Sequence, residues 1–263
     1  MTTISQNIKA LILDMDGVLW RDTEAIGDLP TIFNKIEYLG LKVTFATNNA
    51  TRDETQYIEK LSSFGIDATP KQIVNSSLAT AMTLKKEYPD GGPVYLIGEQ
   101  GLVNILERYG FYPSEENPLC VVVGMDRWVT YEKMSKAALL VGKELPFYGT
   151  NPDKSFPTPK GQTVGTGAIL AAIEAVTDVN PIICGKPFPQ MMDLALERMQ
   201  VTPSEAMVVG DRYETDILGG ISANCISTLV LSGVTPKEKV PSLEPKPDYV
   251  FANLDALINA LAE

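Results

Sequence analysis

Three aspartates stand where short apolar runs of the sequence end. Asp14 and Asp16 follow the run at 10–13, and Asp211 follows the run at 206–209. Two carboxylates about 4 Å apart repel each other by roughly 4 kcal/mol at an effective dielectric constant near 20. If these side chains meet, a bound cation must offset the repulsion, and carboxylate oxygens favour a hard ion such as Mg²⁺. The positions therefore predict a magnesium site built from Asp14, Asp16 and Asp211.

Two further apolar runs end in residues that suit phosphate. Thr47 and Asn48 follow the run at 43–46, and Lys186 follows the run at 181–184. A hydroxyl group, backbone N–H groups and an ammonium group are donors that phosphoryl transfer uses. A metal ion would let one carboxylate oxygen approach phosphorus, while Lys186 and the Thr47 region hold other phosphate oxygens. Together these residues predict chemistry on a phosphate ester.

Each of these groups, taken alone, also has a structural explanation. Thr47 and Asn48 could form a turn or cap a helix. Lys186 could be a solvated surface lysine, and Asp211 and Asp216 could stabilise the start of a helix. The functional explanation is favoured because all four groups follow apolar runs, and ligands of parallel sheets bind beyond the carboxyl ends of the strands.

The composition of the chain excludes several kinds of binding and catalytic site. The chain has 263 residues, with 22 Lys plus Arg, 33 Asp plus Glu and no histidine, which gives a net charge of −11. This charge has the wrong sign for a binder of nucleic-acid polymers or anionic membranes. Without histidine, serine–histidine triads and histidine metal sites are excluded, so acid/base work falls to carboxylates, lysine or tyrosine. With no membrane-length apolar run and no signal-peptide layout, we expect a cytoplasmic protein with reduced cysteines.

The elements that must position these residues alternate along the whole chain. Apolar runs interleave with helical patterns, such as the face formed by Tyr57, Ile58, Leu61 and Phe64. This alternation predicts an α/β fold with a Rossmann-like parallel sheet, helices on both faces, and a smaller inserted α/β domain. We expect a core domain at 1–79 and 181–263 and a cap domain at 80–180. The predicted core strands are 10–13, 43–46, 181–184, 206–209, 226–231 and 249–251.

Four motifs in this order resemble the haloacid dehalogenase (HAD) superfamily of phosphatases. They are DMDGVLW at 14–20, TNN at 47–49, GKP at 185–187 and GDRYETD at 210–216. The resemblance implies that Asp14 is the nucleophile that forms an aspartyl-phosphate. It implies that Asp16 is the general acid and then the general base, with its backbone carbonyl at the metal. Asp211 would complete the metal ligands, and Asp216 would support Lys186 or a metal-bound water.

The segment between TNN and GKP resembles the C2-type α/β cap of the NagD-like and 4-nitrophenylphosphatase-like branch. Further phrases of that branch are GMDR at 124–127 and TNPD at 150–153. The resemblance implies an Mg²⁺-dependent phosphoric monoester hydrolase acting on small phosphorylated metabolites, such as a sugar phosphate, a nucleotide or a 4-nitrophenyl phosphate-like ester. Arg127, Asn151 and Asp153 are candidate substrate contacts in the cap. Caps of this branch often dimerise, so a homodimer through the cap is a candidate assembly.

Other functions stay open from the sequence. A receiver-like phospho-acceptor combines similar residues, although its domain is shorter and its acceptor is not the first of two aspartates on the opening strand. A phosphometabolite-binding or regulatory protein with little turnover is a second alternative, although it would not need Asp16. A phosphomutase would differ only in keeping water from the acyl phosphate.

Overall fold

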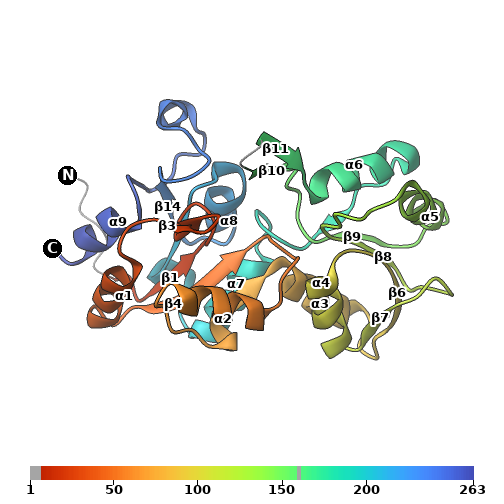
Figure 1. Cartoon of the computed structure of the whole chain (residues 1–263), viewed down its shortest axis with the longest axis horizontal. Coiled ribbons are helices and arrows are strands. Elements are labelled where there is room, and N and C mark those ends of the chain that lie inside the picture. Colours follow the sequence, from red (N-terminus) through yellow and green to blue (C-terminus); the bar gives the residue numbers. More distant parts are fainter. Residues whose placement is uncertain (1–6, 159–160) are drawn as a thin grey trace. The chain divides into compact units, whose positions relative to one another are not determined.

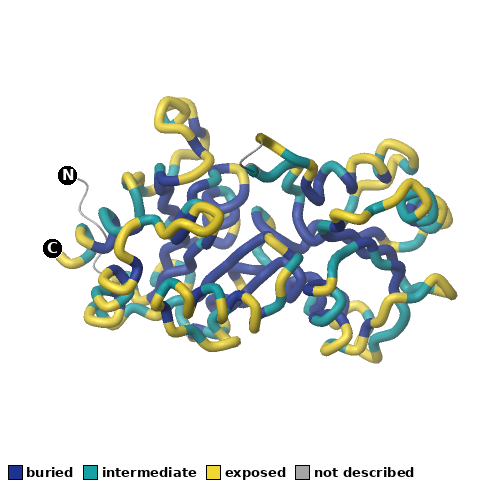
Figure 2. The backbone as a smooth tube through the Cα atoms, viewed as in Figure 1, coloured by how far each residue is buried: buried dark blue, intermediate teal, exposed yellow. Residues whose placement is uncertain are grey.

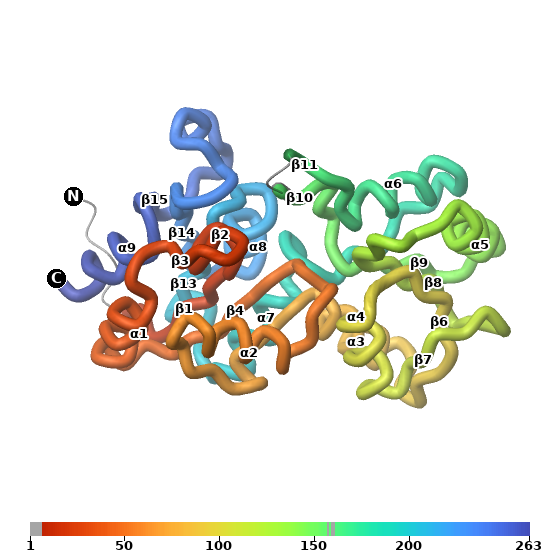
Figure 3. Tube along the Cα trace, in the orientation of Figure 1, coloured from red at the N-terminus to blue at the C-terminus, as the bar shows by residue number. Residues whose placement is uncertain are grey.

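The computed structural model describes residues 7–158 and 161–263, which divide into two compact units (Figure 3). The first unit comprises the described residues up to Thr47, together with Glu54–Val74 and Lys186–Glu263. The second unit comprises Asn48–Asp53 and Asn75–Gly185. The boundaries expected from the sequence, 79/80 and 180/181, both fall inside this second unit.

The first unit is built on a six-stranded sheet in which β1 is a central strand (Figure 1). β1 pairs in parallel with β13 and β4, so Leu13 stands opposite Val209 on one side and Phe45 on the other. All four residues of β1 are buried, as the apolar run predicts for a strand covered on both faces (Figure 2). The strand order is β15 (Tyr249–Phe251), β14 (Ile226–Val230), β13 (Ala206–Gly210), β1 (Ala10–Leu13), β4 (Lys42–Thr47) and β5 (Ile73–Asn75).

Helices flank this sheet, and their ends carry the expected capping residues. Asp28 caps the first helix by accepting a hydrogen bond from Thr31 N, and Asn253 caps the last by accepting one from Ala256 N. The helix predicted from the face around Tyr57 and Leu61 is present. The helices of this unit are α1 (Leu29–Tyr38), α2 (Glu54–Ser63), α7 (Gln190–Met199), α8 (Leu218–Ser222) and α9 (Leu254–Leu261), with the 3₁₀ turns η1 (Pro70–Gln72), η2 (Pro203–Glu205) and η4 (Lys237–Ser242) and the π-helical turn η3 (Tyr213–Ile217).

The second unit has its own five-stranded parallel sheet and its own apolar core. The core includes Ile97, Val121 and Phe147 from the strands and Ile169 from a covering helix. The strand order is β12 (Ile182–Ile183), β9 (Phe147–Gly149), β8 (Val121–Val123), β6 (Gly92–Ile97) and β7 (Phe111–Pro113). The helices are α3 (Ser76–Glu87), α4 (Gln100–Arg108), α5 (Tyr131–Val141) and α6 (Thr166–Thr177).

One strand joins a different sheet from the one expected. The sequence predicts the run at 181–184 in the core sheet, but β12 pairs in parallel with β9 of the second unit, with Ile182 opposite Tyr148. A short apolar run has the same pattern in either sheet, so its partner cannot be read from periodicity. The α/β fold with parallel sheets and flanking helices is otherwise confirmed.

Two short antiparallel pairs complete the fold: β2 (Trp20–Arg21) with β3 (Glu24–Ala25), and β10 (Ser155–Thr158) with β11 (Gly161–Val164). The three cysteines are buried and form no disulfide. No helix within the described ranges combines the length and the apolar character needed to cross a bilayer.

Candidate active site

Asp14 and Lys186 meet at the carboxyl end of β1. Asp14 extends the ladder by donating its backbone N–H to Val209 O at 2.9 Å. The Lys186 Nζ lies 2.6 Å from Asp14 Oδ1, and it also donates to Ala46 O at 2.9 Å. The Lys186 side chain is 3% exposed and that of Asp14 is 12% exposed. A lysine this deeply buried requires anionic partners, so the surface-lysine explanation does not hold.

Asp216 is the second anionic partner of Lys186. It lies on η3, where its Oδ1 accepts from Lys186 Nζ at 2.6 Å and its Oδ2 accepts from Arg212 N at 3.0 Å. These two bonds fix both carboxylate oxygens. The predicted supporting role of Asp216 toward Lys186 therefore matches a direct contact in the first unit.

Asp211 follows β13 and is clamped by the turn at 232–235. Its Oδ2 accepts from Val234 N at 2.6 Å, and its backbone carbonyl accepts from Thr235 N at 3.0 Å. A side chain at Gly17 or Gly233 would collide with the Asp211 carboxylate, and Gly17 also has φ +90°. Glycine at these two positions lets the backbone close around a buried carboxylate.

Burial and neighbouring charges disfavour the ionised form of Asp14 and Asp211 and favour the ionised form of Lys186. Desolvation raises the pKa of Asp14 well above its usual value; the charge of Lys186 opposes this shift, and those of Asp216 and Asp211 add to it. Desolvation and the charge of Asp216 raise the pKa of Asp211 to about 7. Burial alone would lower the pKa of Lys186, but Asp14 and Asp216 outweigh burial and raise it. Lys186 is therefore a constant cation and not a general base.

The acidic group fits a divalent cation. Asp14, Asp211 and Asp216 each offer an oxygen, and these oxygens all lie within 4.8 Å of one another. With Lys186, the ionised group carries a formal charge of −2, which one divalent ion balances. An all-oxygen donor set favours Mg²⁺ over softer metals. The carboxylate of Asp16 does not belong to this group among the residues that the structure describes.

The Asp16 side chain is directed to a tryptophan. Its Oδ1 accepts from Trp20 Nε1 at 2.8 Å and lies 3.9 Å from Lys60 Nζ. The side chain of Asp16 is 54% exposed, in contrast to the more buried Asp14, Asp211 and Asp216. The two aspartates of the opening motif thus occupy different environments, which suits different chemical roles.

Thr47 ends β4 and is buried, and Asn48 is anchored within the second unit. The backbone carbonyl of Asn48 accepts from Asn151 Nδ2 at 2.8 Å and from Ser76 Oγ at 2.6 Å. Its side-chain amide donates to Asp153 Oδ2 at 3.1 Å. Asn151 and Asp153, predicted as candidate substrate contacts, therefore hold the residue that follows Thr47 in the chain.

Arg127, the third cap residue of the prediction, forms an ion pair with Glu99. Its Nη1 lies 3.0 Å from Glu99 Oε2, and its backbone N–H donates to Glu99 Oε1 at 3.1 Å. The Arg127 side chain is 52% exposed, whereas that of Glu99 is 9% exposed. A guanidinium with this exposure remains able to meet an anion.

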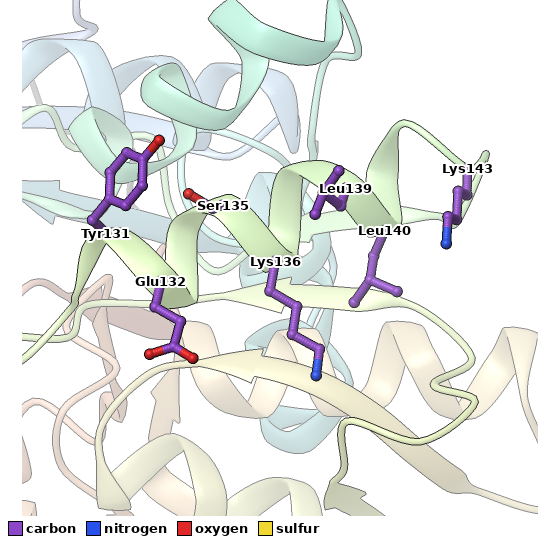
Figure 4. Close-up of a pocket in the computed structure, with 7 residues that line it drawn as sticks. All are labelled: Tyr131, Glu132, Ser135, Lys136, Leu139, Leu140 and Lys143. Carbon is purple, nitrogen blue, oxygen red and sulfur yellow. The ribbon is translucent and has the colours of Figure 1, made fainter.

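An open depression of about 460 Å³ lies on α5, and none of the residues that line it was predicted to be functional (Figure 4). Its lining comes from one face and the end of that helix, including Tyr131, Lys136 and Leu139. It contains no acidic cluster and no buried cation. The depression is therefore not the candidate active site.

Sequence reasoning missed Trp20 and Lys60, which contact Asp16, and Ser76, which contacts Asn48. Trp20 lies inside the DMDGVLW motif, and this position was the one feature of the sequence that could have indicated a role near Asp16. Lys60 and Ser76 come from a helix and a helix start whose sequences show no feature beyond ordinary amphipathic pattern. Only folding brings them to the functional residues.

Known proteins match almost the whole chain. A family model for haloacid dehalogenase-like hydrolases matches residues 11–112, and a HAD-hydrolase-like model matches 183–257. An acid sugar phosphatase of Staphylococcus saprophyticus is 36% identical over 257 residues, which are 97% of this chain and 99% of that protein. The 4-nitrophenylphosphatase of Thermotoga maritima is 35% identical with a TM-score of 0.92, covering 97% of this chain and 98% of that one. A glycerol phosphate phosphatase of Mycobacterium tuberculosis, solved in complex with magnesium, is 29% identical with a TM-score of 0.90, covering 98% of this chain and 78% of that one.

Proposed function

Because the chain belongs to the haloacid dehalogenase-like hydrolases, we propose that it is a magnesium-dependent phosphatase that hydrolyses small phosphate monoesters through an aspartyl-phosphate on Asp14. The observation that carries this proposal is the convergence of Asp14, Asp211, Asp216 and Lys186 at one buried point. Few other reactions need a carboxylate beside a fixed ammonium and two further carboxylates.

In the first half-reaction, an oxygen of Asp14 bonds to phosphorus while the ester P–O bond breaks. The electron pair leaves with the ester oxygen, which takes a proton from the carboxylic acid of Asp16. Lys186 already orients Asp14 through Oδ1 and, as a constant cation, stabilises negative charge on a transferring oxygen. The product is an alcohol and phosphorylated Asp14.

In the second half-reaction, Asp16 has become a carboxylate and acts as the base. It takes a proton from water as the water oxygen bonds to phosphorus, and the bond from phosphorus to Asp14 breaks. Asp14 returns as a carboxylate and inorganic phosphate leaves. The exposed position of Asp16 suits this role, because it must reach both a leaving group and water.

Asp14, Asp211 and Asp216 are the side chains that would hold Mg²⁺ or its bound water, with the backbone carbonyl of Asp16 as a further ligand. The bound ion supplies charge neutralisation, which allows an anionic carboxylate to approach an anionic phosphate. The magnesium complex of the glycerol phosphate phosphatase supports this assignment. Thr47 and the backbone around Asn48 are proposed to donate to phosphate oxygens.

The proposed substrates are small phosphate monoesters of the sugar or polyol phosphate type. This class is supported by the acid sugar phosphatase and glycerol phosphate phosphatase among the similar proteins. Arg127 is the cap residue proposed to contact substrate directly, since its guanidinium is exposed. Asn151 and Asp153 are proposed to act through Asn48, to which both are bonded. A homodimer through the cap stays a proposal that sedimentation analysis can test.

Turnover should depend on Mg²⁺ because the site holds two uncompensated negative charges without it. We expect a panel of 4-nitrophenyl phosphate, glycerol phosphate and sugar phosphates to release phosphate with Mg²⁺. Chelation should lower the rate by at least about 100-fold, and added Mg²⁺ should restore it. Ca²⁺, which prefers more ligands at longer distance, should restore little. Full activity in chelator would contradict the metal assignment, and a stable phosphoprotein without phosphate release would favour the receiver-like alternative.

Metal-free protein should lose stability as pH rises from about 4 to about 7. In the unfolded chain Asp211 has its usual pKa of 3.8, whereas in the folded chain its pKa is about 7. Between these two pH values the folded state binds one proton more than the unfolded state. The free energy of unfolding therefore falls as pH rises, by a few kcal/mol over the whole range. Mg²⁺ should therefore raise the melting temperature more at pH 8 than at pH 5. Thermal unfolding with and without chelator measures this, with Asp211→Asn as the control that removes the Asp211 component. A magnesium shift independent of pH would be inconsistent with it.

A further inference from the structure

The general acid assigned above is held by a tryptophan that the opening motif itself supplies. Trp20 Nε1 donates to Asp16 Oδ1 at 2.8 Å. The indole N–H can only donate, so Oδ1 must accept in both protonation states of Asp16. The carbonyl oxygen of a carboxylic acid accepts more strongly than its hydroxyl oxygen, so this contact favours Oδ2 as the protonated oxygen of Asp16. The contact selects one of two chemically equivalent oxygens as the oxygen that exchanges protons.

Trp20 is enclosed and held through both its ring and its backbone. Trp20 is fully buried, and its ring stacks on Phe64 with centroids 5.3 Å apart and planes inclined by 14°. Its backbone carbonyl accepts from Gly17 N at 2.8 Å, which closes the loop that carries Asp16. Ring and backbone are thus both fixed. Asp16, with 54% of its side chain exposed, is the less enclosed partner of this pair.

Lys60 adds a second contact from α2. Its Nζ lies 4.2 Å from the Trp20 ring centroid and 3.9 Å from Asp16 Oδ1. The ammonium group is attracted by the ring face and by the carboxylate at once. Lys60 and Phe64 are four residues apart, so α2 and its following residue present both to the same indole.

We propose that Trp20, assisted by Lys60, is a positioning residue that holds Asp16 Oδ1 so that Oδ2 delivers the proton to the leaving group. This inference rests on the proposed function, in which Asp16 is the general acid. Without the indole N–H, the exposed carboxylate would sample other rotamers, and the productive one would be less populated. A positioning role of this kind affects only substrates whose leaving group needs the proton.

Two substrates separate this role from a general packing role. The alkoxide that leaves from glycerol phosphate needs protonation, whereas 4-nitrophenolate is a stable anion that needs little. The ratio kcat/KM reports steps through release of the leaving group, so slow hydrolysis of the phosphoenzyme does not enter it. Trp20→Phe keeps the stacked ring and removes the N–H. We expect kcat/KM for glycerol phosphate to fall about tenfold or more, and that for 4-nitrophenyl phosphate to fall less than about threefold.

Two further variants make the test decisive. Asp16→Asn should show the same substrate discrimination more strongly; if it shows none, the proposed role of Asp16 fails, and the failure lies in the proposed function. If Asp16→Asn discriminates between the two substrates, but Trp20→Phe lowers kcat/KM equally for both substrates or for neither, the positioning inference is overturned. Lys60→Met, a change at a partly exposed residue, should cause a smaller selective loss of about threefold. If Trp20→Phe does not fold, Lys60→Met decides alone: a selective loss supports the inference, and an equal loss or no change overturns it.

Discussion

Asp14→Asn is expected to lower kcat by about four to six orders of magnitude. The amide keeps the shape of the carboxylate but is a poor nucleophile, and it cannot form the acyl phosphate. The loss should be the same for glycerol phosphate and 4-nitrophenyl phosphate, because both need the nucleophile. Steady-state phosphate release measures the rate. Quenching with labelled substrate measures the phosphoenzyme, which should be labile to hydroxylamine in wild type and missing from the variant.

The matched control for this change is Asp255→Asn. Asp255 is an aspartate of the same unit with 45% of its side chain exposed, paired with Lys35 at 3.4 Å. The same chemical change there should leave kcat within about twofold of wild type. Asp14→Asn protein that still acquires label, or that retains more than about 1% of activity, would refute Asp14 as the nucleophile.

Lys186→Met is expected to damage both activity and stability. Removal of the ammonium leaves Asp14 and Asp216 buried without their shared cation, which should cost about 3–5 kcal/mol of unfolding free energy. It also removes the group that orients Asp14 and neutralises the transferring phosphate, so kcat should fall by at least about 10³-fold. Denaturant unfolding in chelator and phosphate release with saturating Mg²⁺ measure the two losses separately.

A double variant separates these two effects. Lys186→Met with Asp216→Asn removes one negative charge together with the cation, so most of the lost stability should return while activity stays low. Lys246→Met, at an exposed lysine of the same unit, serves as the control and should change neither quantity appreciably. Recovery of activity in the double variant would show that Lys186 acts only as a structural counter-ion.

The residue types predicted chemistry on a phosphate ester, and the order of the four motifs indicated the hydrolase class proposed here. A chain without histidine, with aspartates after two apolar runs and a lysine after a third, has few other ways to perform acid/base or nucleophilic chemistry. Local periodicity determined the elements as well, since β1 and β13 coincide with their apolar runs to within one residue. Parallel pairing of these two strands then brings the residues that carry Asp14 and Asp211 to the same end of the sheet.

Only the tertiary structure decided the remaining features. These features are contacts between distant segments, and the sequence pattern of each segment does not specify its partner. The run at 181–184 reads equally well in either sheet, and only pairing with β9 assigned it to the second unit. Asp14 and Asp16 are alike in sequence, yet burial beside Lys186 makes one a nucleophile candidate, and contact with Trp20 makes the other an exposed acid. Lys60 reaches Asp16 through the packing of α2. Periodicity gives the direction of a strand or helix face, whereas the partner of each polar side chain depends on which distant segment packs against it.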